Sequence, residues 1–195
     1  MFTREIFNAN LIQNNISFCM FDADLVFLRN PRDFFMRHEE DIVLEALEAA
    51  FLPGLYSYPV ILNQDNSHSY LVMNNGVMCV RASSRVQKFY EAFTTEWLHS
   101  CLDDKGFAQT AFGRVMHRDG LEVQFDASTK SLVGQTETGL SLRTLESGSV
   151  LYLTHGLEVP QNHSYAHAVY GNTDKKGASE WKTSLFKKTN LWFAS

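Results

Sequence analysis

The stretch SFCMFDADLVFLRNP, residues 17–31, carries the strongest structural signal in the chain. Residues 17–21 form a short apolar run, typical of a buried strand, and Asp22 and Asp24 follow it closely. Carboxylates are costly to bury and Asp is disfavoured inside strands, so the pair indicates a strand end that opens into a site. The alternative is that the two carboxylates merely end the strand and face solvent.

An Asp-x-Asp pair on extended backbone points both side chains to the same side. Two hard oxygen ligands in that arrangement suit Mg²⁺ or Mn²⁺, and either ion bridges the oxygens of a diphosphate. In an open α/β sheet, ligands bind beyond the carboxyl ends of the strands, which is where Asp22 and Asp24 stand. The pair therefore predicts a divalent-cation site.

Helical and extended patterns alternate through the rest of the chain, which predicts an α/β layered fold. The clearest helix begins at residues 84–87, which form a capping-box pattern, and it carries one apolar stripe: Val86, Phe89, Tyr90, Phe93 and Trp97. Further helices are expected over residues 2–14, 32–37 and 178–188, and after residue 104. The remaining expectations are strands at 41–44, 121–125 and 150–153, loops at 53–69 and 134–148, and apolar arms at 70–73 and 77–81 on either side of residues 74–76.

Length and composition fit one domain over residues 1–195, because 45% of the residues are hydrophobic and 20% are charged. The formal net charge is −5 and no basic run occurs, which argues against nucleic acid as a partner. No run of about 18 apolar residues occurs either, so no membrane span is expected.

The cysteines and the glycosylation signals are less specific. Cys19 and Cys79 lie in apolar runs and are interpreted as buried thiols, and no close cysteine pair has metal-binding spacing. Two sequons, Asn15-Ile16-Ser17 and Asn162-His163-Ser164, permit N-glycosylation if the chain enters a secretory lumen.

Residues 18–31 closely resemble the core motif of the nucleotide-diphospho-sugar transferases, in the glycosyltransferase family 77-like group with the GT-A fold. Members of that family show an apolar strand, Asp-x-Asp, and then an aromatic residue, Leu, Arg and Pro. Three later elements resemble the family's other motifs in the same order, so that the resemblance spans residues 15–180: MNNGVM at 73–78, DDKGF at 103–107, and HAVYG at 167–171 followed by Lys175 and Lys176.

This resemblance implies an α/β fold of the GT-A-like (Rossmann-like) type and a metal-dependent glycosyltransferase. It implies that Asp24 binds Mn²⁺, or Mg²⁺, directly, and that Asp22 binds the ion through water or holds the donor's ribose or sugar. His167 would be the third protein ligand, since imidazole suits Mn²⁺, and His155 is a competing candidate. The alternative for His167 is an ordinary surface histidine.

The resemblance also assigns residues to the substrate. Asn75 would hydrogen-bond sugar hydroxyls and Gly76 would let the ligand approach the backbone, the alternative being a simple turn or bulge. Lys175 or Lys176 would pair with the diphosphate, the alternative being a solvated surface pair.

The acidic pair Asp103 and Asp104 has two interpretations. One is a helix N-cap followed by a first-turn acid. The other, implied by the resemblance, places one of the two carboxylates near the transferred sugar. Asp104 is the stronger candidate and completes a catalytic set with Asp22 and Asp24.

The implied reaction moves a sugar from a UDP-sugar to a hydroxyl of a glycan or glycoprotein, with retention of the anomeric configuration. The family usually works in the Golgi lumen or at its membrane. In a GT-A domain a base-binding βαβ unit precedes the Asp-x-Asp strand, whereas only one expected helix precedes it here. We therefore expect an N-terminally shortened domain, either a fragment of a larger one or a reduced gene product.

Two alternatives stay open at this point. The chain could be a catalytically inactive or truncated relative of the transferases. It could also be a haloacid-dehalogenase-like phosphatase, in which Asp22 is the nucleophile and Asp24 the general acid. That class needs an acidic pair after its lysine, and Glu180 is the only acid after Lys176.

Overall fold

A computed structural model describes residues 2–23, 25–35, 38–46, 62–65, 68–71, 73–102, 108–146, 150–152, 165–167, 183–184 and 186–187. The chain divides into two compact units, each described by itself below. Unit 1 comprises Met1–Phe21 and His38–Leu145, and unit 2 comprises Asp22–Arg37 and Glu146–Ser195. The expected single domain over residues 1–195 stays a prediction.

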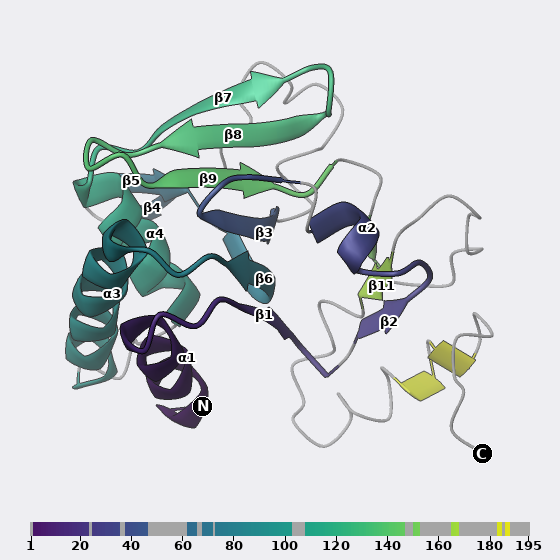
Figure 1. The fold of residues 1–195 in the computed structure, drawn as a ribbon, viewed down its shortest axis with the longest axis horizontal. Helices are drawn as coiled ribbons and strands as arrows, with labels where there is room; N and C mark the ends of the chain where they lie inside the picture. The colour runs from purple at the N-terminus through teal and green to yellow at the C-terminus, as the bar shows by residue number, and fades with distance from the viewer. Residues whose placement is uncertain are drawn as a thin grey trace. The chain divides into compact units, whose positions relative to one another are not determined.

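Unit 1 is built on a six-stranded sheet whose spatial order is β1-β6-β3-β9-β8-β7 (Figure 1). Only β3 and β9 pair in parallel, and the other neighbours in this sheet are antiparallel. The strands are β1 (Phe18–Phe21), β3 (Ile42–Ala46), β6 (Met73–Val80), β7 (Glu122–Asp126), β8 (Ser131–Gln135) and β9 (Ser141–Thr144). A separate hairpin is formed by β4 (Leu62–Asp65) and β5 (His68–Leu71).

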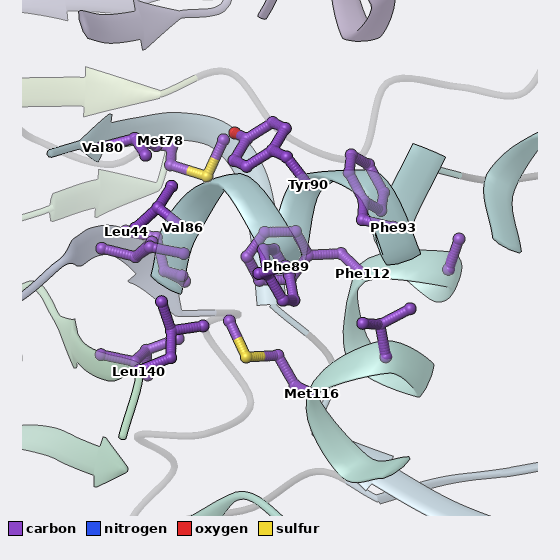
Figure 2. Packing of buried hydrophobic residues seen from close by; sticks show 14 of the residues in the cluster. Leu44, Met78, Val80, Val86, Phe89, Tyr90, Phe93, Phe112, Met116 and Leu140 are labelled. Atoms are coloured by element: carbon purple, nitrogen blue, oxygen red, sulfur yellow. The ribbon is translucent and has the colours of Figure 1, made fainter. Parts of the chain in front are cut away.

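Three helices pack their apolar sides against one face of this sheet: α1 (Phe2–Gln13), α3 (Ser84–Leu102) and α4 (Ala108–Arg118). Leu44 of β3 and Met78 of β6 lie in the same cluster as the α3 and α4 side chains (Figure 2). All five residues of the predicted α3 stripe are buried, as are Ala111, Phe112 and Val115 of α4. The α/β layered fold expected from the sequence is therefore confirmed, with a mostly antiparallel sheet.

The core of unit 1 is aromatic. The rings of Phe89 and Phe112 meet edge to face with centroids 4.8 Å apart, and Phe93 contacts both Phe112 and Tyr90 in the same manner. Edge-to-face pairs of this kind add stability beyond the area they bury. Burial raises the pKa of the Tyr90 hydroxyl well above its ordinary value, and the nearby Glu5 carboxylate raises it further, so this hydroxyl stays neutral.

A buried carboxylate, Asp41, ties the sheet to α3. Asp41 is 5% exposed and accepts hydrogen bonds from the Arg85 guanidinium, with Nη2 at 3.2 Å, and from the Ser83 hydroxyl. It also accepts the backbone N–H of Ser141 at 3.0 Å, while the Asp41 N–H donates to Ser141 Oγ at 2.9 Å. The side chain thus joins the starts of β3, α3 and β9.

Cys19 and Cys79 form a disulfide, so their interpretation as buried thiols is wrong. The two residues stand directly opposite each other in the antiparallel β1–β6 ladder. Cys19 is exposed, and it alternates with Phe18 and Met20, which pack on the helical core. Strand register, which a single sequence does not reveal, created the pair. Among the described residues Cys101 is the free thiol.

Residues 74–76, for which a turn or bulge is the alternative to a binding role, lie within β6 at a bulge. Two local expectations are wrong. The region 134–148 is not a loop, since it holds the end of β8 and all of β9. Part of the expected loop 53–69 lies in the β4–β5 hairpin. The N-cap of α3 is also one residue earlier than expected, because Ser83 Oγ accepts the N–H of Val86.

Unit 2 contains a three-stranded sheet in the order β10-β11-β2. Its elements are β2 (Leu25–Phe27), the short helix α2 (Arg32–Phe35), β10 (Val150–Tyr152) and β11 (Tyr165–His167). The central strand β11 pairs in parallel with β10 and antiparallel with β2, and its Ala166 is wholly buried. Residues 183–184 and 186–187 are helical, within the expected helix 178–188. No helix in the described part of the chain is long and apolar enough to span a membrane.

Replacing Cys19 and Cys79 together by Ala is expected to lower the free energy of unfolding by about 4 kcal/mol, because the disulfide closes a loop with a sequence separation of 60 residues. Urea denaturation followed by tryptophan fluorescence measures this change. Cys101→Ala is the matched control and should cost much less. A double variant as stable as the control would contradict the cross-link.

Asp41→Asn is expected to lower the free energy of unfolding by about 2 kcal/mol, since it removes a charged acceptor from a buried network. The exposed Glu91→Gln on α3 is the control and should stay within about 0.5 kcal/mol of the wild type. Equal stabilities for the two variants in the same denaturation experiment would show that Asp41 does not hold the three elements together.

Candidate functional site

The Asp-x-Asp segment lies between two strands. β1 ends at Phe21, Asp22 follows outside any strand and is half-buried, and Ala23 lies in an exposed turn. β2 then begins at Leu25. The strand end that the sequence predicts before Asp22 is therefore confirmed. Asp24 itself lies outside the described residues.

Strand pairing in unit 2 brings His167 to the same segment. β11 pairs with β2 so that His167 stands opposite Leu25, Ala166 opposite Val26 and Tyr165 opposite Phe27. Opposite residues of an antiparallel pair have Cα atoms about 4.5–5.5 Å apart. His167, one of the three predicted metal ligands, therefore stands directly across from Leu25, the residue that follows Asp24 in the sequence.

Asn75 and Gly76 lie in a bulge of β6 within unit 1. The register between β3 and β6 passes from Leu44–Met78 directly to Glu45–Asn74, so one step along β3 faces several residues of β6. Gly76 is buried. Bulges occur preferentially beside binding sites, where they redirect side chains. The bulge named as the alternative for this pair is thus present, and the substrate-binding role of Asn75 and Gly76 stays a prediction.

Several predicted site residues lie outside the described residues: Asp24, Asp103, Asp104, His155, Lys175 and Lys176. For Asn75 and His167 the structure describes the backbone only. Their assigned roles therefore stay predictions. Among the described side chains no group of three His, Cys, Asp or Glu residues is arranged to hold a metal ion.

The donor types of the predicted ligands are those that a divalent cation takes. Asp22 is half-buried in unit 2, and the β11–β2 register brings His167 opposite the residue after Asp24. Two carboxylates and an imidazole are donors that Mn²⁺ accepts, and carboxylates alone suit Mg²⁺. Asp22, Asp24 and His167 would be the residues to hold such an ion, and this assignment stays a prediction.

Glu45 is a candidate that the sequence interpretation missed. It is wholly buried, follows the apolar residues 42–44 of β3, and pairs with Asn74 beside the bulge. The signal was present, because an apolar run that ends in an acid is the pattern that drew attention to Asp22. A carboxylate so fully buried requires polar contacts, and its place beside the bulge makes Glu45 a candidate for a site there.

A surface hollow of about 790 Å³ lies over α3 and α4 in unit 1. Its charged side chains include Glu96, which pairs with Arg118 at 2.5 Å and with Arg114 at 3.6 Å. The lining contains none of the predicted site residues. We assign it no catalytic role.

Comparison with known proteins identifies one family. The family model described as nucleotide-diphospho-sugar transferase matches residues 1–176. No significant similarity to a curated protein or to a solved structure was found.

The β11–β2 register is tested by paired cysteines in a Cys101→Ala background. The pair Val26→Cys/Ala166→Cys is expected to form a disulfide under mild oxidation, because the two residues stand opposite each other. Mass spectrometry of the unreduced tryptic digest detects the linked peptides. The out-of-register pair Phe27→Cys/Ala166→Cys is the control, and equal cross-linking in both variants would contradict the register.

Proposed function

Because the chain belongs to the nucleotide-diphospho-sugar transferase family, we propose that it is a metal-dependent glycosyltransferase. The donor we propose is a UDP-sugar and the acceptor a hydroxyl group of a glycan or glycoprotein. The observation that best supports a site in this chain is the pairing of β11 with β2, which sets His167 opposite the residue after Asp24.

In this proposal Asp22, Asp24 and His167 hold Mn²⁺ or Mg²⁺. The bound cation would supply charge neutralisation for the nucleoside diphosphate as it leaves. Lys175 or Lys176 would add a point charge to the diphosphate. Asp104 would contact the transferred sugar, with Asp103 beside it, while Asn75 and Gly76 would contact sugar hydroxyls.

We also propose retention of the anomeric configuration, so that no strong general base need act on the acceptor. The leaving phosphate would then take the acceptor proton. The proposed location is the Golgi lumen. A disulfide between Cys19 and Cys79 supports a compartment of this kind, because disulfides persist in the oxidising secretory pathway.

The phosphatase alternative makes a different demand on Asp22. That carboxylate would attack a phosphate ester and form a phospho-aspartate. The family match over residues 1–176 supports the transferase instead. A phosphatase would hydrolyse p-nitrophenyl phosphate and lose this activity in Asp22→Asn, whereas a transferase would show no such hydrolysis at all.

Mn²⁺ together with UDP is expected to raise the melting temperature of the wild-type chain and to leave that of Asp24→Ala unchanged. A ligand present at a hundredfold excess over its Kd stabilises the folded state by about 2.7 kcal/mol. Differential scanning fluorimetry with Mn²⁺, UDP, both and neither measures the shifts. The control is Asp33→Ala, an exposed acid in the first turn of α2 that should respond like the wild type.

An equal rise in melting temperature in Asp24→Ala and the wild type would show that Asp24 does not hold the metal ion, and would contradict the proposed site. Catalysis is separated from binding by the Mn²⁺-dependent release of UDP from UDP-sugars. A chain that binds Mn²⁺ and UDP without releasing UDP from any donor, with or without glycan acceptors, is the inactive relative rather than the enzyme.

A further inference from the structure

The sequon Asn15-Ile16-Ser17 occupies the turn between α1 and β1 in unit 1. All three residues are exposed, Ile16 to 48% of its surface. A sequon is a short pattern that often arises by chance, so its position in the fold matters more than its presence. Here a glycan would extend from an exposed turn into solvent.

The backbone at this turn makes the Asn15 side chain dispensable for folding. Asn15 has a left-handed φ of 58° and its N–H donates to the Ile12 carbonyl at 2.9 Å. The Ile16 N–H donates to the Leu11 carbonyl, also at 2.9 Å. This is the Schellman arrangement that ends a helix with main-chain hydrogen bonds, and Asn is second to Gly in tolerating its left-handed position. A sugar on Asn15 Nδ2 therefore breaks no contact that ends α1.

The contact that Ser17, the third residue of the sequon, makes in the folded unit indicates that glycosylation precedes the folding of this segment. In the folded unit Ser17 Oγ accepts the N–H of Ala82 at 2.9 Å. An oligosaccharyltransferase must recognise the Ser hydroxyl, so modification belongs to the chain before β1 docks beside the segment that follows β6. This matches co-translational glycosylation of an unfolded chain.

An independent observation points to the compartment in which sequons are used. Cys19, two residues after the sequon, is exposed and is disulfide-bonded to Cys79. Cytosolic thiol systems keep cysteines reduced, whereas the secretory lumen allows an accessible disulfide to persist. Two unrelated features of one turn and strand, a covalent cross-link and an exposed acceptor motif, thus require the same environment.

We propose that Asn15 carries an N-linked glycan. Its amide nitrogen attacks the anomeric carbon of a lipid-diphosphate-linked oligosaccharide, so a nitrogen–carbon bond forms, the carbon–oxygen bond to the diphosphate breaks, and the amide loses one proton. The proposal rests on the lumenal location proposed above and is independent of catalysis. The glycan would stand beside β1, which lies at one end of the strand order of the described sheet.

The test is secretion of the full chain from a eukaryotic cell behind a cleavable signal peptide, which places every variant in the lumen. Peptide-N-glycosidase treatment is expected to reduce the mass of the secreted wild type and to convert Asn15 to Asp, which peptide mass spectrometry locates. Asn15→Gly should abolish modification of this site while folding normally, because Gly adopts the left-handed backbone. Asn162→Gln, which removes the other sequon, should leave it intact.

Two substitutions of Ser17 separate recognition of the sequon by the glycosylating enzyme from effects on the fold. Ser17→Thr keeps the sequon and should stay glycosylated at Asn15, whereas Ser17→Ala should lose the glycan although Asn15 is unchanged. Secreted wild-type protein with unmodified Asn15 would overturn the proposal. The UDP and Mn²⁺ response of the same preparation, before and after glycosidase treatment, reports separately on the proposed function.

Discussion

The buried carboxylate of Asp41 is the contact on which the architecture of unit 1 depends. It is held by Arg85 and Ser83 at the start of α3 and by Ser141 at the start of β9. Those bonds fix where β9 begins beside β3, and this parallel ladder is the link between the β1–β6–β3 and β9–β8–β7 halves of the sheet. A carboxylate is costly to bury without such partners, so the network also selects one register over its neighbours.

The helices of unit 1 could be predicted because their signal is local. The spacing of Val86, Phe89, Tyr90, Phe93 and Trp97 places them on one face of a helix whatever the rest of the chain does. The strands were harder to predict from the sequence, because each one pairs with a segment that is distant along the chain. β9 is short and lies in a Gly- and Thr-rich region that resembles a loop, and only its ladders with β3 and β8 make it a strand. The disulfide and the β6 bulge are likewise properties of register, which local patterns do not encode.

The candidate site could be predicted only in part, because some of its signals are local in the sequence and others depend on strand pairing. The strand end before Asp22 follows from an apolar run that stops at a carboxylate, and it is observed. His167 was assigned through its place in a family motif, and its position opposite Leu25 depends on a strand pair that no periodicity reveals. Glu45 repeats the pattern of Asp22 but lacks a second acid two residues later, so it drew no attention although it is wholly buried.

The β3–β9 ladder also shapes how unit 1 folds. The hydrogen bonds that lock it connect residues 100 positions apart, whereas β7, β8 and β9 form a local meander and α3 and α4 are neighbours in sequence. The chain must lose the entropy of the intervening loop before the hydrogen bonds of such a distant pair form. A fold with many pairs of this kind therefore folds more slowly. During synthesis β3 emerges before both of its partners, and because β6 precedes β9 in the chain, the edge that pairs with β9 stays open longest. The sheet is complete only after Thr144 has emerged, which makes the closure of β3 on β9 a late event in the life of the nascent chain.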